Sequence, residues 1–240
     1  GTRFGGSAEI PLMADYLVGD SRSGMCFSEA MIGLVPGWAG IARALVKSGP
    51  VNAAYMAMTS RETKAPDLAR VGIYNTVVEV PLPFPKKERT DDPDADKVRY
   101  LQALAEHDRK TGLLVLPEGL RVATCAKDDI PGVRPEERAV LASEEEIAEE
   151  VARRVDPGTY AGLHGKPLKE AREKIARLGR PLAPQSIEAL TGLLKGIDPG
   201  QMDEAAFVRR EMAADARLYR DRRFRAGLTA TLGQSVADYR

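Results

Sequence analysis

Helical and strand patterns alternate over the first eighty residues of the chain. Gly5 and Gly6 read as a tight turn that opens a short helix, in which Pro11 is tolerated because it falls in the first turn. Apolar residues at helical spacing predict further helices, and short β-branched or apolar runs predict strands. In chain order these are strands at 16–18 and 25–27, a helix that stops at Gly49, helices at 51–58 and 65–71, and a strand at 74–80. This order is typical of an α/β fold.

The pattern changes after residue 80. Residues 81–96 mix prolines with lysines and aspartates, which predicts a linker or a long surface loop. A helix near 96–110, a proline-interrupted apolar stretch at 113–117 and a loop at 127–138 follow. The last hundred residues are mostly helical by pattern. Their predicted helices lie at 143–154, with Ser143 as its cap, at a stripe over 187–194, and at 202–219 and 224–232.

Composition excludes several classes of protein. The 240 residues are 43% hydrophobic and 29% charged, which is enough for a substantial core in one or two domains. Lys plus Arg equals Asp plus Glu at 35 each, so the net charge favours neither nucleic acid nor an anionic membrane. No apolar run approaches the ~20 residues that span a bilayer, and no signal segment opens the chain. We expect a soluble, cytoplasmic protein with no nucleic-acid or membrane partner.

The cysteines and histidines do not indicate a metal site. Cys26 and Cys125 lie far apart without the spacing of a metal knuckle, so reduced thiols are expected. His107 and His164 have no Cys, Asp or Glu at ligand spacing, which favours surface or loop roles. We expect no metal.

Two glutamates are the candidate chemical groups. Glu9 and Glu29 lie twenty residues apart, each in a glycine-punctuated apolar segment. Taken alone, Glu9 is explained by the favourable interaction of a carboxylate with the N-terminal end of a helix dipole. Glu29, taken alone, is explained as a half-exposed acid in a loop. Together, carboxyls in apolar surroundings have raised pKa values, and two of them at one substrate move protons in opposite directions. A glycine pair at a helix start also leaves the Gly6 N–H open to a developing oxyanion, although a plain tight turn explains it as well.

Four sequence blocks resemble the crotonase (enoyl-CoA hydratase/isomerase) superfamily. They are GGSAEIPLMADY at 5–16, FSE at 27–29, IGLVPGWAG at 32–40 and ARVGIYNTVV at 69–78. The resemblance covers residues 4–80 clearly and the helices of 183–232 more weakly. It implies a crotonase-like α/β fold, a spiral of ββα units followed by a helical C-terminal region. The implied parts are 1–80, the C-terminal part of the catalytic core; 81–181, a linker and long helical insertion; and 182–240, the C-terminal helical region.

The resemblance also implies roles for single residues. Gly6 corresponds to one half of the family's oxyanion hole, and Glu9 and Glu29 to its two catalytic glutamates, which hold a water between them. Gly37 falls in the glycine-rich turn beside that water, and Gly5 and Trp38 are expected to bind substrate, with simple packing as the alternative for Trp38. Both glutamates being present favours a lyase that hydrates a 2-enoyl-CoA or catalyses the reverse. Coenzyme A enters as part of the substrate, and no other cofactor is expected.

Departures from the family pattern leave alternatives open. Residues 81–181 are much longer than the matching part of a simple hydratase, so an isomerase, a thioester or C–C hydrolase, or a cofactor-free oxygenase acting on an unusual acyl-CoA remains open. The first strands and the second oxyanion-hole N–H have no counterpart after Gly1. We expect an N-terminal half as a separate chain or a missing segment, an exposed sheet edge, and trimers or hexamers. A non-catalytic assembly subunit that completes a partner chain is the rival interpretation.

Overall fold

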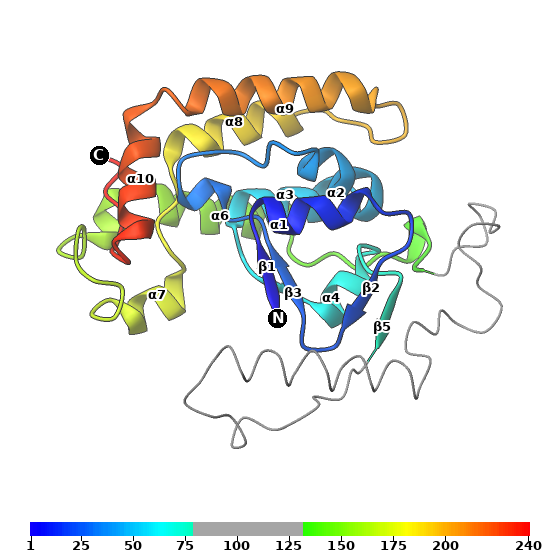
Figure 1. Ribbon diagram of the computed structural model, residues 1–240, viewed down its shortest axis with the longest axis horizontal. Coiled ribbons are helices and arrows are strands. Elements are labelled where there is room, and N and C mark those ends of the chain that lie inside the picture. Colours follow the sequence, from blue (N-terminus) through cyan, green and yellow to red (C-terminus); the bar gives the residue numbers. More distant parts are fainter. Residues whose placement is uncertain (79–131) are drawn as a thin grey trace, which may run out of the picture. The chain divides into compact units, whose positions relative to one another are not determined.

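Two small sheets lie below layers of helices in the computed structural model, which describes residues 1–78 and 132–240 (Figure 1). Strands β1 (Thr2–Phe4), β3 (Gly24–Cys26) and β4 (Thr63–Lys64) form a sheet in the order β1-β3-β4. β1 runs parallel to β3, with Phe4 opposite Cys26, and β4 runs antiparallel to β3. Strands β2 (Val18–Asp20) and β5 (Thr76–Val78) form the second sheet. The sequence does not predict β1, because three residues with one apolar side chain give no alternation of polar and apolar positions.

Short helices connect the strands of the first eighty residues. Helix α1 (Gly6–Glu9) continues into a 3₁₀ turn at Ile10–Met13, and a second 3₁₀ turn, η2, covers Glu29–Met31. Helices α2 (Gly40–Ser48), α3 (Pro50–Thr59) and α4 (Ala65–Arg70) follow. Gly49, at φ +80°, separates α2 from α3, and Pro50 begins the next helix without losing a hydrogen bond. The predicted helices of this region are therefore confirmed.

The second described part is helical. Its bounds are η5 (Pro135–Glu137), α6 (Glu144–Val155), η6 (Pro157–Tyr160), α7 (Arg172–Leu178), α8 (Pro184–Leu194), α9 (Glu204–Leu218) and α10 (Arg222–Leu232). Ser143 caps α6 as predicted: its Oγ accepts the Glu146 N–H, and Glu146 Oε2 accepts the Ser143 N–H. Asp203 and Asp221 cap α9 and α10 without such a reciprocal bond, their Oδ1 atoms accepting the N–H groups of Ala206 and Arg223.

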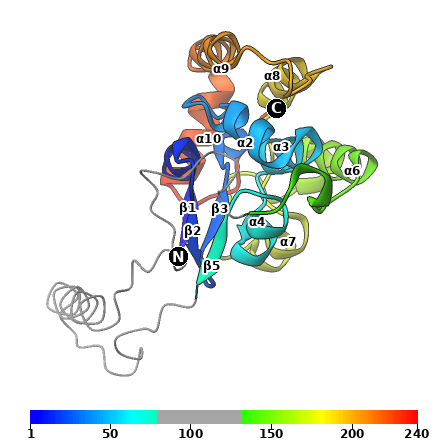
Figure 2. The same cartoon turned by 90° about the vertical axis from the view of Figure 1, so that its right-hand side faces the viewer.

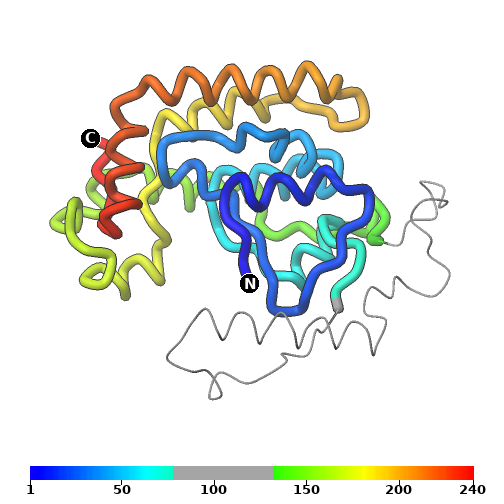
Figure 3. Tube along the Cα trace, in the orientation of Figure 1, coloured from blue at the N-terminus to red at the C-terminus, as the bar shows by residue number. Residues whose placement is uncertain are grey.

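Helices α2, α3, α6, α8 and α9 pack around one shared core. α3 contacts α2, α6 and α8, and α9 contacts α2 and α8. Figure 2 shows α8 and α9 at the end opposite to β5, and Figure 3 follows the chain from the blue N-terminal strand to the red C-terminal segment. Ile41 and Leu45 of α2 are fully buried between these layers, whereas Val46 of the same helix is 43% exposed.

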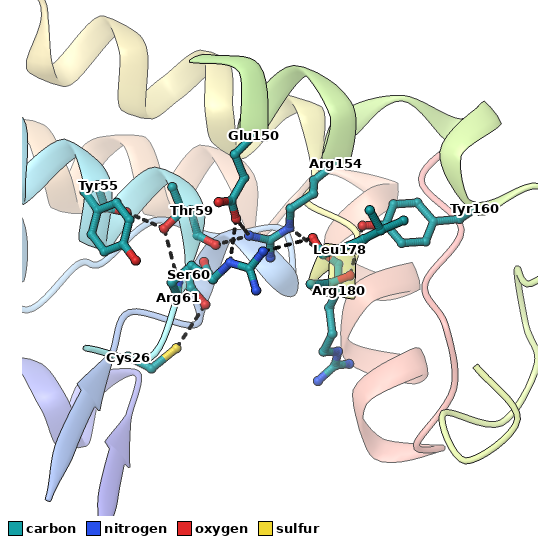
Figure 4. A network of polar contacts seen from close by, with 11 residues as sticks. Cys26, Tyr55, Thr59, Ser60, Arg61, Glu150, Arg154, Tyr160, Leu178 and Arg180 are labelled. Carbon is teal, nitrogen blue, oxygen red and sulfur yellow. Dashed lines mark hydrogen bonds and ion pairs between the residues drawn. The ribbon is translucent and has the colours of Figure 1, made fainter. Parts of the chain in front are cut away.

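A buried arginine ties α6 to the end of α3. Arg154 is 1% exposed, and its guanidinium donates to the backbone oxygens of Thr59 and Arg180 and pairs with Glu150 at 2.7 Å (Figure 4). Glu150 also pairs with Arg61. The buried thiol of Cys26 lies at the edge of this network and donates to the Ser60 oxygen at 3.3 Å. These bonds satisfy a buried charge that would otherwise be costly.

Residues 1–77 and 131–240 form one unit by their contacts. The predicted division at 80 and 181 stays a prediction. The linker at 81–96, the helix at 96–110, the stretch at 113–117, His107 and Cys125 lie outside the described residues. Within 1–78 and 132–240, no helix is both long and apolar enough to cross a membrane.

Candidate active site

Glu9 is a buried carboxyl that two backbone N–H groups hold. It ends α1, is 2% exposed, and its Oε2 accepts the Trp38 N–H at 2.8 Å and the Gly40 N–H at 3.1 Å. These donors lie at the start of α2, where the helix dipole also favours negative charge. Burial raises the pKa of Glu9, and the two hydrogen bonds oppose that rise.

Glu29 is a buried carboxyl with less support. It begins η2, two residues after the Phe27 that follows β3, and is 7% exposed, so it is not the half-exposed loop acid of the simplest interpretation. Its Oε2 has no hydrogen-bond partner among the described residues. Burial, and then the charge of Glu9, raise the pKa of Glu29 to about 8. At neutral pH this carboxyl therefore holds its proton.

The structure brings the two predicted glutamates together. The negative charge of Glu9 is the second cause of the raised pKa of Glu29, so the two carboxyls lie within range of each other's charge in a poorly solvated place. Their surroundings divide the roles. Two hydrogen bonds from the Trp38 and Gly40 N–H groups favour the charged form of Glu9, whereas burial outweighs the single backbone hydrogen bond of Glu29 and favours its neutral form.

Glycines leave the space that these carboxyls fill. A Cβ at Gly5 would stand 2.8 Å from Glu29 Oε1, and a Cβ at Gly40 would stand 2.5 Å from Glu9 Oε2. Gly5 also has a φ of +56°, which side chains other than glycine rarely adopt. The glycine interpreted from the sequence as substrate-binding thus leaves the space that the Glu29 carboxyl occupies.

Gly6 presents a free donor at the same helix start. Its N–H donates to no acceptor in the part of the chain that the structure describes, while the neighbouring Gly5 N–H is used by the Cys26 oxygen. Ser7 adapts to the position, because its Oγ donates to the Phe4 oxygen at 2.7 Å and accepts the Phe4 N–H. The Gly6 N–H is therefore available to an oxygen that gains negative charge.

Trp38 and Gly37 act on Glu9 through their backbone N–H groups. The Trp38 indole is 63% exposed and so is not core packing, while its N–H holds Glu9. The N–H of Gly37 also lowers the pKa of Glu9. Substrate contacts for Gly5, Gly37 and Trp38 stay predictions. In residues 1–78 and 132–240, no group of three His, Cys, Asp or Glu side chains is placed to hold a metal ion.

Two further carboxyls, both on α9, bind backbone N–H groups on either side of the Trp38 and Gly40 donors. Glu211 is fully buried, and its Oε1 accepts the Ala42 N–H at 2.7 Å. Asp215, one helical turn later, accepts the Val35 N–H at 3.3 Å. Neither belongs to the sequence blocks. The one signal for Glu211 is its place in the buried stripe of α9, which reads Phe207, Glu211, Ala214 and Leu218.

The first third of the chain matches a known family. Residues 1–82 match the sequence model of enoyl-CoA hydratase/isomerase. The chain is 31% identical over 123 residues to a carnitinyl-CoA dehydratase of Proteus mirabilis (strain HI4320), covering 51% of this chain and 47% of that protein. It is 37% identical over 79 residues to a fatty acid oxidation complex subunit alpha of Idiomarina loihiensis, covering 33% of this chain and 11% of that protein. The chain spans less than half the length of both relatives.

The fold is also that of a solved relative. A carnitinyl-CoA dehydratase from Mycobacterium thermoresistibile aligns with a TM-score of 0.50 at 13% identity, covering 97% of this chain and 59% of that chain. The α/β fold with a helical C-terminal region expected from the sequence is confirmed.

Proposed function

Residues 1–82 belong to the enoyl-CoA hydratase/isomerase family, the crotonase superfamily, and from that premise we propose that the protein hydrates a 2-enoyl-CoA thioester or catalyses the reverse dehydration. The supporting observation is the unequal surroundings of two coupled, buried carboxyls. Glu9 has two N–H donors that favour its charged form, and Glu29 has a pKa of about 8 that keeps it protonated. One group is suited to act as a base and the other as an acid.

The proposed reaction assigns each group one proton. The Glu9 carboxylate takes a proton from water as the water oxygen bonds to the β-carbon of the enoyl group. The electron pair of the carbon–carbon double bond moves toward the thioester, and its oxygen gains negative charge that the Gly6 N–H stabilises. Glu29 then gives its proton to the α-carbon. The proton taken by Glu9 leaves through solvent, and Glu29 recovers one, so that the overall change is addition of one water.

Replacement of Glu29 tests this proposal. The full chain is mixed with a 2-enoyl-CoA, and 3-hydroxyacyl-CoA is measured by the loss of enoyl absorbance and by the mass gain of one water. Glu29→Gln should lower the rate by about 100-fold or more, the usual range for losing a general acid. Glu188→Gln, on the exposed face of α8, is the matched control and should retain the wild-type rate. A Glu29→Gln rate equal to that of the control would contradict the acid role.

Product analysis separates the alternative reactions. An isomerase would move the double bond without changing the mass, a thioester or C–C hydrolase would release free coenzyme A or a shortened acyl group, and an oxygenase would consume oxygen. Any of these outcomes, with no hydrated product, would replace the hydratase proposal while keeping an acyl-CoA substrate.

An exposed apolar face supports a second proposal. Phe4 on β1, and Ile10 and Met13 in the 3₁₀ turn after α1, are each about half exposed, at 54%, 51% and 49%. We also propose that another polypeptide segment, in this chain or a partner, covers this face and supplies a second oxyanion-hole donor. Co-purification from the native source tests it. A stoichiometric partner with acyl-CoA turnover only in the complex is expected, whereas a stable lone chain without acyl-CoA affinity favours a non-catalytic assembly subunit.

A further inference from the structure

Helix α9 holds both ends of the loop that positions Glu9. Asp215 Oδ1 binds the Val35 N–H at the start of this loop, and Glu211 Oε1 binds the Ala42 N–H just beyond its end. Between them, the N–H groups of Trp38 and Gly40 bind Glu9. α2 contacts α1 and α9, and the segment before α2 runs alongside α9 (Figures 1 and 3).

Asp215 also lies directly against the glycine turn of the site. A Cβ at Gly37 would stand 3.0 Å from Asp215 Oδ2. Gly37 therefore leaves space for Asp215 as Gly5 does for Glu29 and Gly40 does for Glu9. Three glycines of the family blocks each adjoin one carboxyl, and the third carboxyl comes from a helix far along the chain.

The charge of Asp215 reaches both members of the acid–base pair. It raises the pKa of Glu9 and of Glu29, in each case as a smaller cause than burial. Burial raises the pKa of Asp215 itself. Tyr219, one turn later on α9, has a pKa raised first by burial and then by Asp215.

The charged groups on neighbouring elements have other partners or face elsewhere. Arg43 of α2 pairs with Glu204 at 2.8 Å. Arg210, Arg217 and Glu188 line the groove between α8 and α9. Glu211 lies one turn before Asp215, and the charge of Glu9 contributes to the raised pKa of Glu211.

We propose that Asp215 is a positioning residue of the active site, which anchors the Val35–Gly37 turn and acts on the Glu9 and Glu29 pair through its negative charge. The effect of Asp215 on turnover rests on the proposed function. It goes beyond that function because it assigns a third carboxyl, from the C-terminal helical region, to the control of proton transfer. The role is electrostatic and geometric, and no proton passes through Asp215 to substrate.

The pH dependence of turnover separates this role from a structural one. In the full chain, the acid limb of the kcat/KM profile reports Glu9 losing its proton and the alkaline limb reports Glu29 losing its own. Asp215→Asn removes a negative charge, so both limbs should move to lower pH together, by about half a pH unit for a partly buried neighbour. Asp215→Glu should keep the wild-type limbs, and Glu188→Gln controls for loss of an acid on the adjacent helix. A rate lowered equally at all pH values, or unchanged limbs, would overturn the proposal.

A titration without substrate keeps this test independent of the proposed reaction. Carboxyl NMR of the full chain, labelled in glutamate and assigned with Glu29→Gln, should show the Glu29 midpoint at lower pH in Asp215→Asn than in the wild type. If enoyl-CoA is not turned over but the midpoint moves, the proposed function fails and the role of Asp215 stands. Asp215→Ser, which keeps a hydroxyl acceptor, replaces Asp215→Asn if that variant does not fold. An unmoved midpoint in the folded variant would overturn the inference.

Discussion

The α/β region at residues 1–78 and the helices α8–α10 supply the site with carboxyls in different ways. In the first region, Glu9 and Glu29 lie in short glycine-rich segments, and each glutamate adjoins a glycine that leaves room for it. In the second, Glu211 and Asp215 occupy successive turns of a regular fifteen-residue helix. Turns and 3₁₀ segments aim a side chain locally, whereas a long helix presents groups four residues apart on one face.

The buried carboxyls of the two regions differ in their hydrogen bonds. Glu9 is held by two N–H groups, and Glu211 by one, with its second oxygen unpartnered among the described residues. Burial raises the pKa of Glu211 to about 8, as it does for Glu29. Burying a carboxyl costs free energy, and a carboxyl that transfers protons depends on the raised pKa that burial produces. A carboxyl that anchors a loop needs only one good hydrogen bond.

Filling the space beside Glu9 is the strongest way to break this arrangement. Gly40→Ala places a Cβ 2.5 Å from Glu9 Oε2 and 2.6 Å from its Cγ, so the buried side chain must move and lose its bonds to Trp38 and Gly40. We expect a loss of about 1–3 kcal/mol in unfolding free energy, the usual cost of overpacking, together with loss of acyl-CoA turnover. Chemical denaturation and turnover measure the two effects.

Gly192→Ala is the matched control for Gly40→Ala. Gly192 lies within α8, where an added Cβ meets nothing within 4 Å. Alanine favours a helix over glycine by up to about 1 kcal/mol, so this variant should be neutral or more stable. Equal stability in the two variants would mean that Gly40 does not adjoin a fixed carboxyl.

The pH dependence of stability sharpens the comparison through Glu211. Its pKa is about 8 in the folded protein against an ordinary value of 4.5, so the folded state binds the extra proton between these pH values. The contribution of Glu211 to the unfolding free energy should therefore be largest below pH 4.5 and fall as the pH rises toward 8, by up to about 1.4 kcal/mol per pH unit.

Glu211→Gln should remove the contribution of this carboxyl to the fall of the unfolding free energy with pH, so the slope of free energy against pH should be smaller. Denaturant titrations at several pH values measure it, with the exposed Glu188→Gln as the control that keeps the wild-type slope. If both variants keep the wild-type slope of unfolding free energy against pH, the pKa of Glu211 is not raised. The helical region then contributes less to the site than its geometry indicates.

Much of the fold was predictable from local signals. Gly49 and Pro50 end one helix and begin the next, Ser143 caps α6, and the twenty-residue spacing of Glu9 and Glu29 leads to two neighbouring buried carboxyls. These features depend on residues close in sequence, or on a motif whose parts have a fixed spacing.

The C-terminal contribution was not predictable because it depends on packing between distant segments. Asp215 meets Val35 across 180 positions, and Glu211 meets Ala42 across 169. An acid in the buried stripe of α9 was a visible sign, yet it does not say which N–H it meets. The contact of Gly5 with Glu29 was hidden for the same reason, since a glycine in a turn has several explanations.

The coupling of Glu9 to Glu29 is tested most directly by titrating Glu29 in the presence and absence of the Glu9 charge. Carboxyl NMR of the full-length wild type and of Glu9→Gln follows the Glu29 midpoint, which the structure places at about 8. Glutamine removes the charge and keeps an oxygen for the Trp38 and Gly40 N–H groups. The account predicts that the Glu29 midpoint moves to lower pH in Glu9→Gln, because a neighbouring negative charge has been removed. A Glu29 midpoint that is the same in both proteins would contradict the convergence of the two carboxyls on one site.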